Sequence, residues 1–304
     1  MKKNVGLRNK KTTVDYVLAA IAIFIGVVTV YPMWYVICMS ISDPGPVIRG
    51  EVTFLPIGFC LDAYKTIFKD TQLFRSLLNS VLYVLFALAM MLTSCIMVAY
   101  PLTRPNLKGR KFVVFFLLIP MYFGGSMIPT YLIYTKYLHL YDTFWAVAIP
   151  HGFSIMNIIL CRSFLAGIPG DLTEAARIDG ASNTQVLLKI IIPLAMPVLA
   201  VISIYTIVAV WNSWFSSMLY QANTDLHPVQ MYLQRLLIQQ KVNINDLVEQ
   251  GASTSVIADA VRASQVANQL KYAMITVVTL PILMVYPMFQ KHFVKGVMLG
   301  SLKG

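Results

Sequence analysis

The chain has 304 residues, of which 58% are hydrophobic and only 12% are charged. Ordinary soluble domains carry about 25% charged residues, so this composition excludes a typical soluble protein. The net charge of +11 does not by itself indicate a nucleic-acid partner, because the basic residues are distributed as in a membrane protein.

Six runs without Asp, Glu, Lys or Arg extend over 19 residues or more. About 20 apolar residues cross a bilayer core as a helix, so each run is long enough to span once. The basic stretch 1–15 precedes a run that is too long for a signal peptide and lacks its cleavage pattern, which indicates a retained first helix. The sequence therefore predicts an all-α polytopic membrane protein with six transmembrane helices, at residues 16–42, 76–103, 112–135, 143–161, 190–224 and 272–290.

The segments between these runs differ in basic content. With the N-terminus in the cytoplasm, the inside segments hold 15 Lys and Arg residues, and the longer outside segments hold 9. Positive charge inside is the usual orientation signal and suits an anionic inner leaflet, so we expect a multi-pass protein of the cell membrane with both termini cytoplasmic. The inside segments are 1–15, 104–111, 162–189 and 291–304, and the outside segments are 43–75, 136–142 and 225–271.

This pattern predicts a basic tail at 1–15, a first helix at 16–42, an extracellular segment at 43–75, a membrane core at 76–290 and a cytoplasmic tail at 291–304. The core contains a long outside loop, 221–271, in which 231–239 is predicted to be helical. The loop is either a lid over the outer mouth or a docking loop for an extracellular partner, and its length does not decide between them. Prolines interrupt the spans and favour kinked helices around a cavity.

The inside segment 168–193 contains a polar elbow between two apolar runs. Asp171 is predicted to cap a short helix, with Glu174 three residues later. Ala175 and Ala176 leave one face thin, which permits close approach by another protein, and Gly180 is predicted to end the helix in the left-handed conformation. Local capping alone would explain the same residues, so the elbow predicts a helix–turn–helix whether or not a partner binds it.

The residues of the elbow resemble a known signature. Glu174-Ala175-Ala176, then Gly180, then Ile190, Ile192 and Pro193 at matching spacing are similar to the motif of type I ABC importer permeases, with Ile192 in place of leucine. The flanking 168–173 and 177–181 and the end of the chain from Lys291 resemble the carbohydrate-uptake branch, similar to the second permease of maltose-type importers. The run 211–215 further resembles the subgroup that handles complex oligosaccharides and aldouronates.

This resemblance implies a transport mechanism. The chain would pair with a homologous permease, two cytoplasmic ATPase subunits and an extracellular lipid-anchored or periplasmic solute-binding protein, and would import an oligosaccharide. ATP and Mg would bind to the partner subunits, because this chain lacks a phosphate-binding loop; it is expected to hold no cofactor and not to be an enzyme. The elbow would contact the ATPases through Glu174, Ala175, Ala176, Asp179, Gly180, Ile190 and Pro193, with the tail contributing Lys291, Lys295 and Gly296.

Candidate residues for the sugar path are Trp211, Asn212, His151 and Tyr131. Trp211 and Asn212 offer an aromatic face and hydrogen bonds, but tryptophan at that depth is also expected as a belt residue at the membrane interface. His151 lies inside the fourth run, between Pro150 and Gly152, where it is either functional or a neutral side chain bonded to a carbonyl. Tyr131 either lines a cavity or packs.

Two other classes of membrane protein would require particular residue types inside the spans. An ion- or proton-coupled secondary carrier would require acidic or basic relays inside the spans, and the six runs contain only His151 as a candidate. A membrane-embedded enzyme would require a cluster with acid-base or metal-ligand spacing, and the four cysteines and the spans offer none. The carrier is the alternative that the sequence leaves open.

Overall fold

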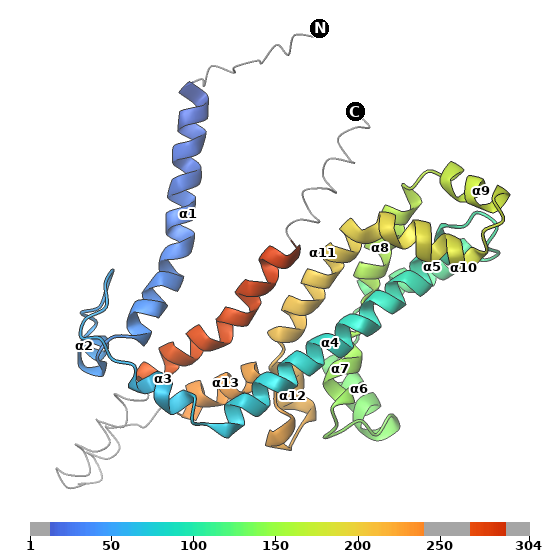
Figure 1. The fold of residues 1–304 in the computed structure, drawn as a ribbon. Helices are drawn as coiled ribbons and strands as arrows, with labels where there is room; N and C mark the ends of the chain where they lie inside the picture. Colours follow the sequence, from blue (N-terminus) through green and yellow to red (C-terminus); the bar gives the residue numbers. More distant parts are fainter. Residues whose placement is uncertain (1–12, 240–267, 290–304) are drawn as a thin grey trace. The chain divides into compact units, whose positions relative to one another are not determined.

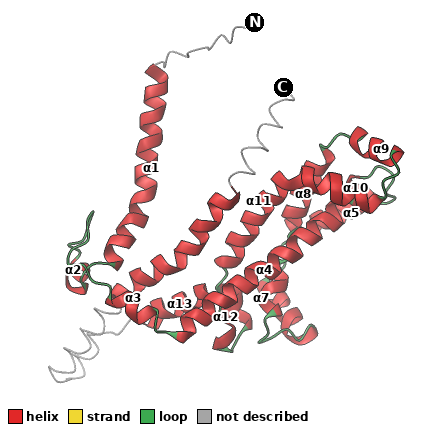
Figure 2. Ribbon diagram, viewed as in Figure 1, coloured by secondary structure: helices red, strands yellow, loops and turns green. Residues whose placement is uncertain are grey.

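The computed structural model describes residues 13–239 and 268–289 (Figure 1). Regular structure within these residues is helical, and the β-type pairing that they contain is an isolated bridge between Ser42 and Phe59 (Figure 2). This confirms the predicted all-α class. The described residues form two compact units: one comprises 13–67 and 268–276, and the other comprises 68–239 and 277–289. The division falls within the helix Asn268–Phe289.

The first unit contains α1 (Thr13–Ser40), α2 (Pro44–Arg49) and α3 (Asp62–Ile67). The Asp43 side chain accepts a hydrogen bond from the Gly45 N–H at the start of α2, and Gly50 ends this helix at φ 69°. A small cluster of Cys38, Met39, Val47 and Val52 packs with Tyr35 and Tyr272. Most of α1 has its apolar side chains exposed, as expected for a helix that contacts lipid or another apolar surface.

The second unit contains most of the helices. They are α4 (Thr71–Ala99), the 3-10 turn η1 (Pro101–Thr103), α5 (Arg110–Tyr122), α6 (Met127–Leu132), the π-helical η2 (Ile133–Tyr137), α7 (Trp145–His151), α8 (Ile155–Ala166), α9 (Asp171–Ile178), α10 (Asn183–Val186), the π-helical η3 (Leu187–Ile191), α11 (Ile192–Trp211), α12 (Phe215–Tyr220), the 3-10 turn η4 (Thr224–Leu226) and α13 (Val229–Gln239). The helix α13 confirms the helical prediction for 231–239.

The helices long and apolar enough to cross a membrane correspond to the six predicted runs, with one difference. Five are continuous spans: Thr13–Ser40, Thr71–Thr103, Trp145–Ala166, Asn183–Trp211 and Asn268–Phe289. The third run is a pair, Arg110–Tyr122 and Met127–Tyr137, bent by 110°. The break contains Gly124 and Gly125 and follows Pro120, which removes a helix hydrogen bond. The expectation of one merely kinked helix at 112–135 was therefore wrong.

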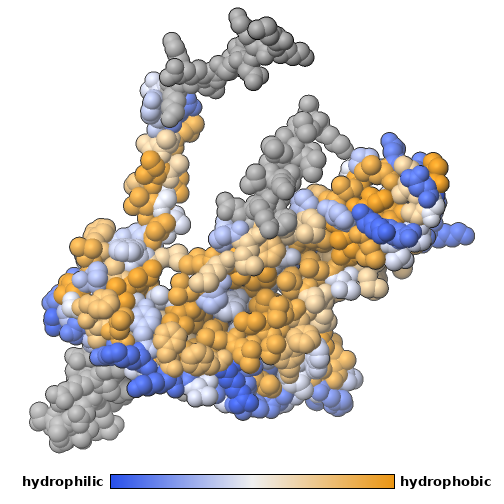
Figure 3. All heavy atoms as spheres, in the orientation of Figure 1, coloured by the Kyte–Doolittle hydropathy of each residue, from blue (hydrophilic) through white to orange (hydrophobic). Residues whose placement is uncertain are grey.

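The core of the second unit lies between α4, α8 and α11. Its buried side chains include Cys95 of α4, Cys161 of α8 and Ile202 of α11, all fully buried. Small side chains such as Ala99 and Ala195 allow the three helices to approach closely. In the face shown in Figure 3, apolar surface covers the middle of these helices and hydrophilic residues gather toward their ends, as expected for a bundle that crosses a bilayer.

The turn between α7 and α8 packs tightly against α4. A Cβ added at Gly152 would lie 2.7 Å from the Met90 Cβ, so neither side-chain rotation nor a shorter side chain at position 90 relieves the contact. We expect Gly152→Ala to lower the unfolding free energy by about 1–3 kcal/mol through overpacking. Gly26→Ala in α1 is the matched control, because its added Cβ meets nothing within 4 Å. Thermal unfolding in detergent checks both, and equal midpoints would contradict the packing described here.

Candidate functional site

The elbow predicted between the fourth and fifth runs is formed by α9 and α10, which lie together at one end of α8 and α11 (Figure 1). The start of α9 differs from the prediction. Gly170 precedes the helix, and its carbonyl accepts hydrogen bonds from the Thr173 N–H and hydroxyl, both at 2.8 Å. Asp171 is therefore the first helical residue rather than the cap. With Glu174 it places two carboxylates in the first turn, where they complement the helix dipole.

The C-terminus of α9 is the predicted glycine turn. Gly180 has φ 82°, and its N–H donates to the Arg177 carbonyl at 3.0 Å. The Ala181 N–H donates to the Ala176 carbonyl at 2.9 Å. These two bonds form a Schellman motif, which satisfies carbonyls at the end of the helix and requires a left-handed residue at position 180. The prediction for the conformation of Gly180 is confirmed.

A second cap begins α10 directly after this turn. The Ser182 hydroxyl accepts from the Gln185 N–H at 3.3 Å, and the Gln185 side chain accepts from the Ser182 N–H at 2.8 Å, which is a capping box. Arg177 of α9 donates to the Asn183 side chain at 3.1 Å and ties the two short helices together. The chain then passes through the π-helical η3 into α11. The elbow is thus a defined shape, fixed by its own hydrogen bonds.

The predicted ATPase-contact residues do not share one surface. Glu174, Ala175, Asp179 and Gly180 are exposed, and Pro193 is exposed in the first turn of α11. Ile190 is half-buried within η3. Ala176 is also half-buried and packs against the α4–α8–α11 core. The small side chain of Ala176 therefore brings the elbow close to its own bundle, which corrects the expectation that it offers a thin outer face.

The prediction from the sequence did not include an exposed apolar residue of α9. Ile178 is the last residue of α9 and its side chain is 87% exposed, beside the Gly180 turn. Leu172 is a second exposed apolar residue on this helix. Neither side chain packs in the core of the second unit, so both are free to contact another protein. The signal was present in the sequence as an isoleucine directly before the turn of a polar elbow.

The elbow is connected to the end of α4 through Arg104, which follows η1. Its guanidinium lies over the Tyr100 ring at 4.4 Å and donates to the Tyr100 hydroxyl at 2.5 Å. It also donates to the Thr173 hydroxyl of α9 at 3.5 Å. Arg162 of α8 donates to the Leu102 carbonyl at 3.4 Å. Polar contacts therefore link α9 to the end of α4, and α8 to η1.

The proposed sugar-path residues lie in different surroundings. His151 ends α7, and its Nδ1 lies 3.0 Å from the Val147 carbonyl, the carbonyl contact considered as the alternative to function. Trp211 is only 5% exposed, and its indole N–H donates to the Val278 carbonyl at 3.2 Å. In this conformation Trp211 packs in the core of the second unit and exposes neither a sugar-binding face nor an interfacial ring, and its role in the sugar path stays a prediction. Asn212 is exposed, and its side chain accepts from Gln230 at 3.3 Å.

Tyr131 belongs to an aromatic group. Its ring stacks on Tyr220 of α12 with a centroid distance of 5.9 Å, and Tyr134 approaches the same ring at 5.3 Å. The group joins α6 and the π-helical η2 to α12. Tyr131 is half-buried rather than fully buried, so a role in the sugar path stays a prediction.

Lys291, Lys295 and Gly296 lie outside the described residues, as does the greater part of the outside loop after Gln239. Over the described part of the chain, no group of three His, Cys, Asp or Glu residues could hold a metal ion. That the chain holds no cofactor stays a prediction.

Five continuous apolar helices, a bent third span and a polar elbow closed by its own hydrogen bonds are the features of a multi-pass membrane protein. A family model described as binding-protein-dependent transport system inner membrane component matches residues 72–299, which include both the elbow and the core. The chain belongs to this family. The expected permease fold and transport function are confirmed, and the family is one of transport components rather than enzymes.

Two relatives from Bacillus subtilis (strain 168) align with nearly the whole chain. The polygalacturonan/rhamnogalacturonan transport system permease protein YtcP is 33% identical over 295 residues, covering 97% of this chain and 100% of YtcP. Protein LplC is 35% identical over 280 residues, covering 92% of this chain and 91% of LplC. A solved structure of a bacterial ABC transporter involved in the import of the acidic polysaccharide alginate has a chain with a TM-score of 0.80 and 29% identity, covering 93% of this chain and 99% of that one.

Proposed function

We propose that the chain is the permease subunit of an ATP-driven importer of oligosaccharides, and that the α9–α10 elbow couples it to cytoplasmic ATPases. The single observation that carries the coupling role is the exposed apolar Ile178 on a helix whose conformation is fixed at both ends by hydrogen bonds. A rigid elbow transmits displacement, whereas a flexible one would absorb it. The contacts from Arg104 to Thr173 and from Arg162 to Leu102 then carry the displacement into α4 and α8.

The proposed assembly contains this chain, a homologous permease, two ATPases and a solute-binding protein. ATP and Mg bind to the ATPases, and closure of the ATPase pair switches the permease pair from inward- to outward-facing. The elbow end faces the cytoplasm, together with both termini. The opposite end of the second unit, formed by α12, η4 and α13, faces outside and receives the sugar from the binding protein. The distribution of basic residues supports this orientation.

An oligosaccharide substrate is supported by the names of relatives that cover nearly the whole chain. YtcP is named for polygalacturonan and rhamnogalacturonan transport, and the solved transporter is described as importing alginate. Within this chain, the half-buried Tyr131 and Tyr134 offer aromatic rings near the outer end, packed on the buried Tyr220, and Asn212 offers an exposed amide. Aromatic faces with a few placed polar groups are the usual composition of a site for a small hydroxylated ligand.

Reconstitution tests this function. The complete complex in liposomes, with the binding protein outside, is supplied with labelled neutral and uronate oligosaccharides, and uptake is measured with ATP inside. We expect uptake to require ATP and the binding protein, and to persist when an ionophore collapses the proton gradient. Uptake that is lost with the gradient and indifferent to ATP would overturn the proposal in favour of a proton-coupled carrier.

A further inference from the structure

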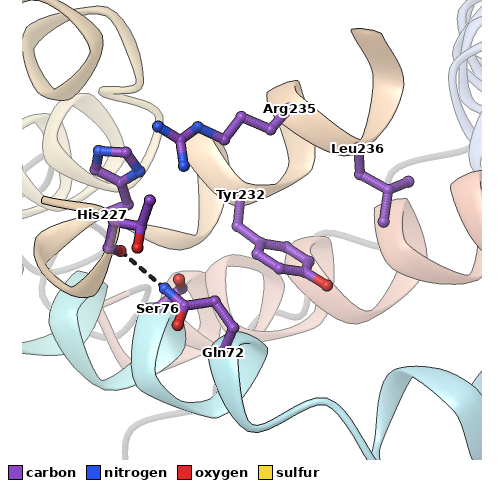
Figure 4. A pocket seen from close by; sticks show the side chains of 7 residues that line it. Gln72, Ser76, His227, Tyr232, Arg235 and Leu236 are labelled. Carbon is purple, nitrogen blue, oxygen red and sulfur yellow. Dashed lines mark hydrogen bonds between the residues drawn. The ribbon is translucent and has the colours of Figure 1, made fainter. Parts of the chain in front are cut away.

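A pocket of about 320 Å³ lies between α4 and α13 (Figure 4), at the end of the second unit opposite the elbow (Figure 1). Gln72 and Ser76, from the first turns of α4, form one wall. Tyr232, Arg235 and Leu236 of α13 form the other, and Thr224 and His227 complete the lining. This volume is at the lower end of the range for small-molecule sites and is large enough for one sugar unit.

The pocket walls are held in place by several hydrogen bonds between segments far apart in the sequence. Gln72 donates to the Thr224 carbonyl at 2.8 Å, and Asn79 donates to the Asp225 carbonyl at 2.7 Å. The Tyr83 hydroxyl donates to the Leu226 carbonyl at 2.8 Å. The polar backbone of η4 is thus satisfied by α4, and the pocket between them is preformed rather than a gap between loosely associated loops.

Ser76 is the unusual member of this lining. Ser80, one turn further along α4, accepts a hydrogen bond from the Val229 N–H at 2.8 Å. Ser76 lies on the same face of the helix and is also fully buried, but its hydroxyl has no hydrogen-bond partner within the described structure. Buried hydroxyl groups are nearly always paired, so the unpaired Ser76 hydroxyl in the pocket wall leaves a hydrogen bond that water or a ligand hydroxyl can complete.

The other side chains define the chemistry of that ligand. Arg235 is a cation whose planar guanidinium binds carboxylates in a bidentate fashion. Gln72 and Thr224 carry polar groups for hydroxyls, and Tyr232 offers a ring face. Asp70 is an acid beside the pocket, and both its oxygens are engaged: one accepts from the Gln72 N–H at 2.8 Å and the other from the Tyr232 hydroxyl. Asp70 therefore orients the Tyr232 ring.

His227 adds no positive charge near neutral pH. Burial lowers the pKa of its imidazole, and the nearby Arg235 guanidinium lowers it further, while the Gln221 carbonyl and Asp142 act in the opposite direction. The pocket at neutral pH thus combines one cation with neutral hydrogen-bonding groups, which suits a ligand with one carboxylate and several hydroxyls.

We propose that this pocket is a subsite for one uronate unit of an acidic saccharide, with Arg235 binding its carboxylate and Ser76 one of its hydroxyls. The inference rests on the proposed function, which supplies a saccharide and places this end of the unit outside. It makes the outer end of this subunit a determinant of substrate charge. Neither the elbow nor Tyr131, Trp211, Asn212 and His151 belong to this pocket.

The test uses the complete reconstituted importer and two probes that differ only in charge: an oligogalacturonate and the same oligosaccharide with its carboxylates methyl-esterified. We expect Arg235→Gln to raise the KM for the acidic form by about tenfold or more and to leave the KM for the ester unchanged. Arg235→Lys should fall between the two, because it keeps the charge without the bidentate geometry. Arg75→Gln is the matched control, because Arg75 pairs with Asp225 outside the pocket lining.

The Ser76→Ala variant distinguishes a serine that binds the ligand from one that only stabilises the fold. We expect the thermal midpoint of the ligand-free protein to stay unchanged or rise, because an unpaired buried hydroxyl is removed, while the KM for the acidic saccharide rises several-fold. An equal effect of Arg235→Gln on both probes, no effect on either, or wild-type uptake of the ester alone would overturn the subsite. Failure of the wild type to take up any saccharide would instead overturn the proposed function.

Discussion

Gly180→Val is expected to lower ATP-dependent uptake by at least about tenfold. The turn after α9 requires φ 82° at this position. A left-handed conformation costs an ordinary L-residue about 1–2 kcal/mol and a β-branched residue more, and about 1.4 kcal/mol changes an equilibrium tenfold. An added Cβ would meet nothing within 4 Å, so the loss would come from the backbone conformation alone. Uptake and co-purification of the ATPases with the variant complex measure the effect.

Gly180→Asn is the matched control, because asparagine tolerates the left-handed conformation and occurs at this position of helix C-caps. Gly180→Asn should retain most of the uptake, although it adds a side chain at position 180 just as Gly180→Val does. Normal transport by Gly180→Val, with the ATPases still bound, would count against a coupling role for the elbow.

Ile178→Asp is expected to weaken association with the ATPases by about 30-fold or more. The side chain is 87% exposed, so replacing it should change the stability of the isolated chain by no more than about 0.5 kcal/mol. In an interface, a central apolar anchor contributes about 2 kcal/mol or more, which corresponds to the stated factor. Ile178→Leu keeps the apolar volume and should behave like the wild type.

The measurement is the binding of the purified ATPase subunits to the permease pair in nanodiscs, with thermal unfolding of each variant as the folding control. A normal ATPase affinity for Ile178→Asp would remove Ile178 from the docking surface. A lowered affinity together with a lowered thermal midpoint would show that the residue acts on folding rather than on docking.

Much of the architecture could be predicted because its causes are local. A bilayer span requires about 20 residues without charge, and such a run is visible in any window of the sequence. The turn at Gly180 and the start of α10 after Ser182 each depend on capping hydrogen bonds. Each of these bonds joins residues no more than five positions apart. The family signature occupies the same short stretch, which is why the residues of the elbow were sufficient to indicate a transport subunit.

Predictions failed where a distant segment decided the outcome. The third run has the composition of a single span, yet its two halves meet at 110°. Hydropathy reports how much of a segment is apolar and not the direction in which it runs, so Pro120, Gly124 and Gly125 indicated only a weak point. Trp211 is a residue type expected in a sugar site or in the interfacial belt. The Val278 carbonyl, 67 positions away, accepts its N–H, and Trp211 lies in the core.

Hydropathy and helix capping act over a few neighbouring residues, so the class, the number and order of the apolar segments and the turn at Gly180 could be predicted from the sequence. The tertiary structure alone decided which side chains share a site. Ser76 and Arg235 meet at one pocket because α4 binds the backbone of η4 and α13 from about 150 positions away, as the hydrogen bonds from Gln72 and to Ser80 show. No local pattern encodes such a pairing, since it depends on which polar groups remain unsatisfied once the helices have packed.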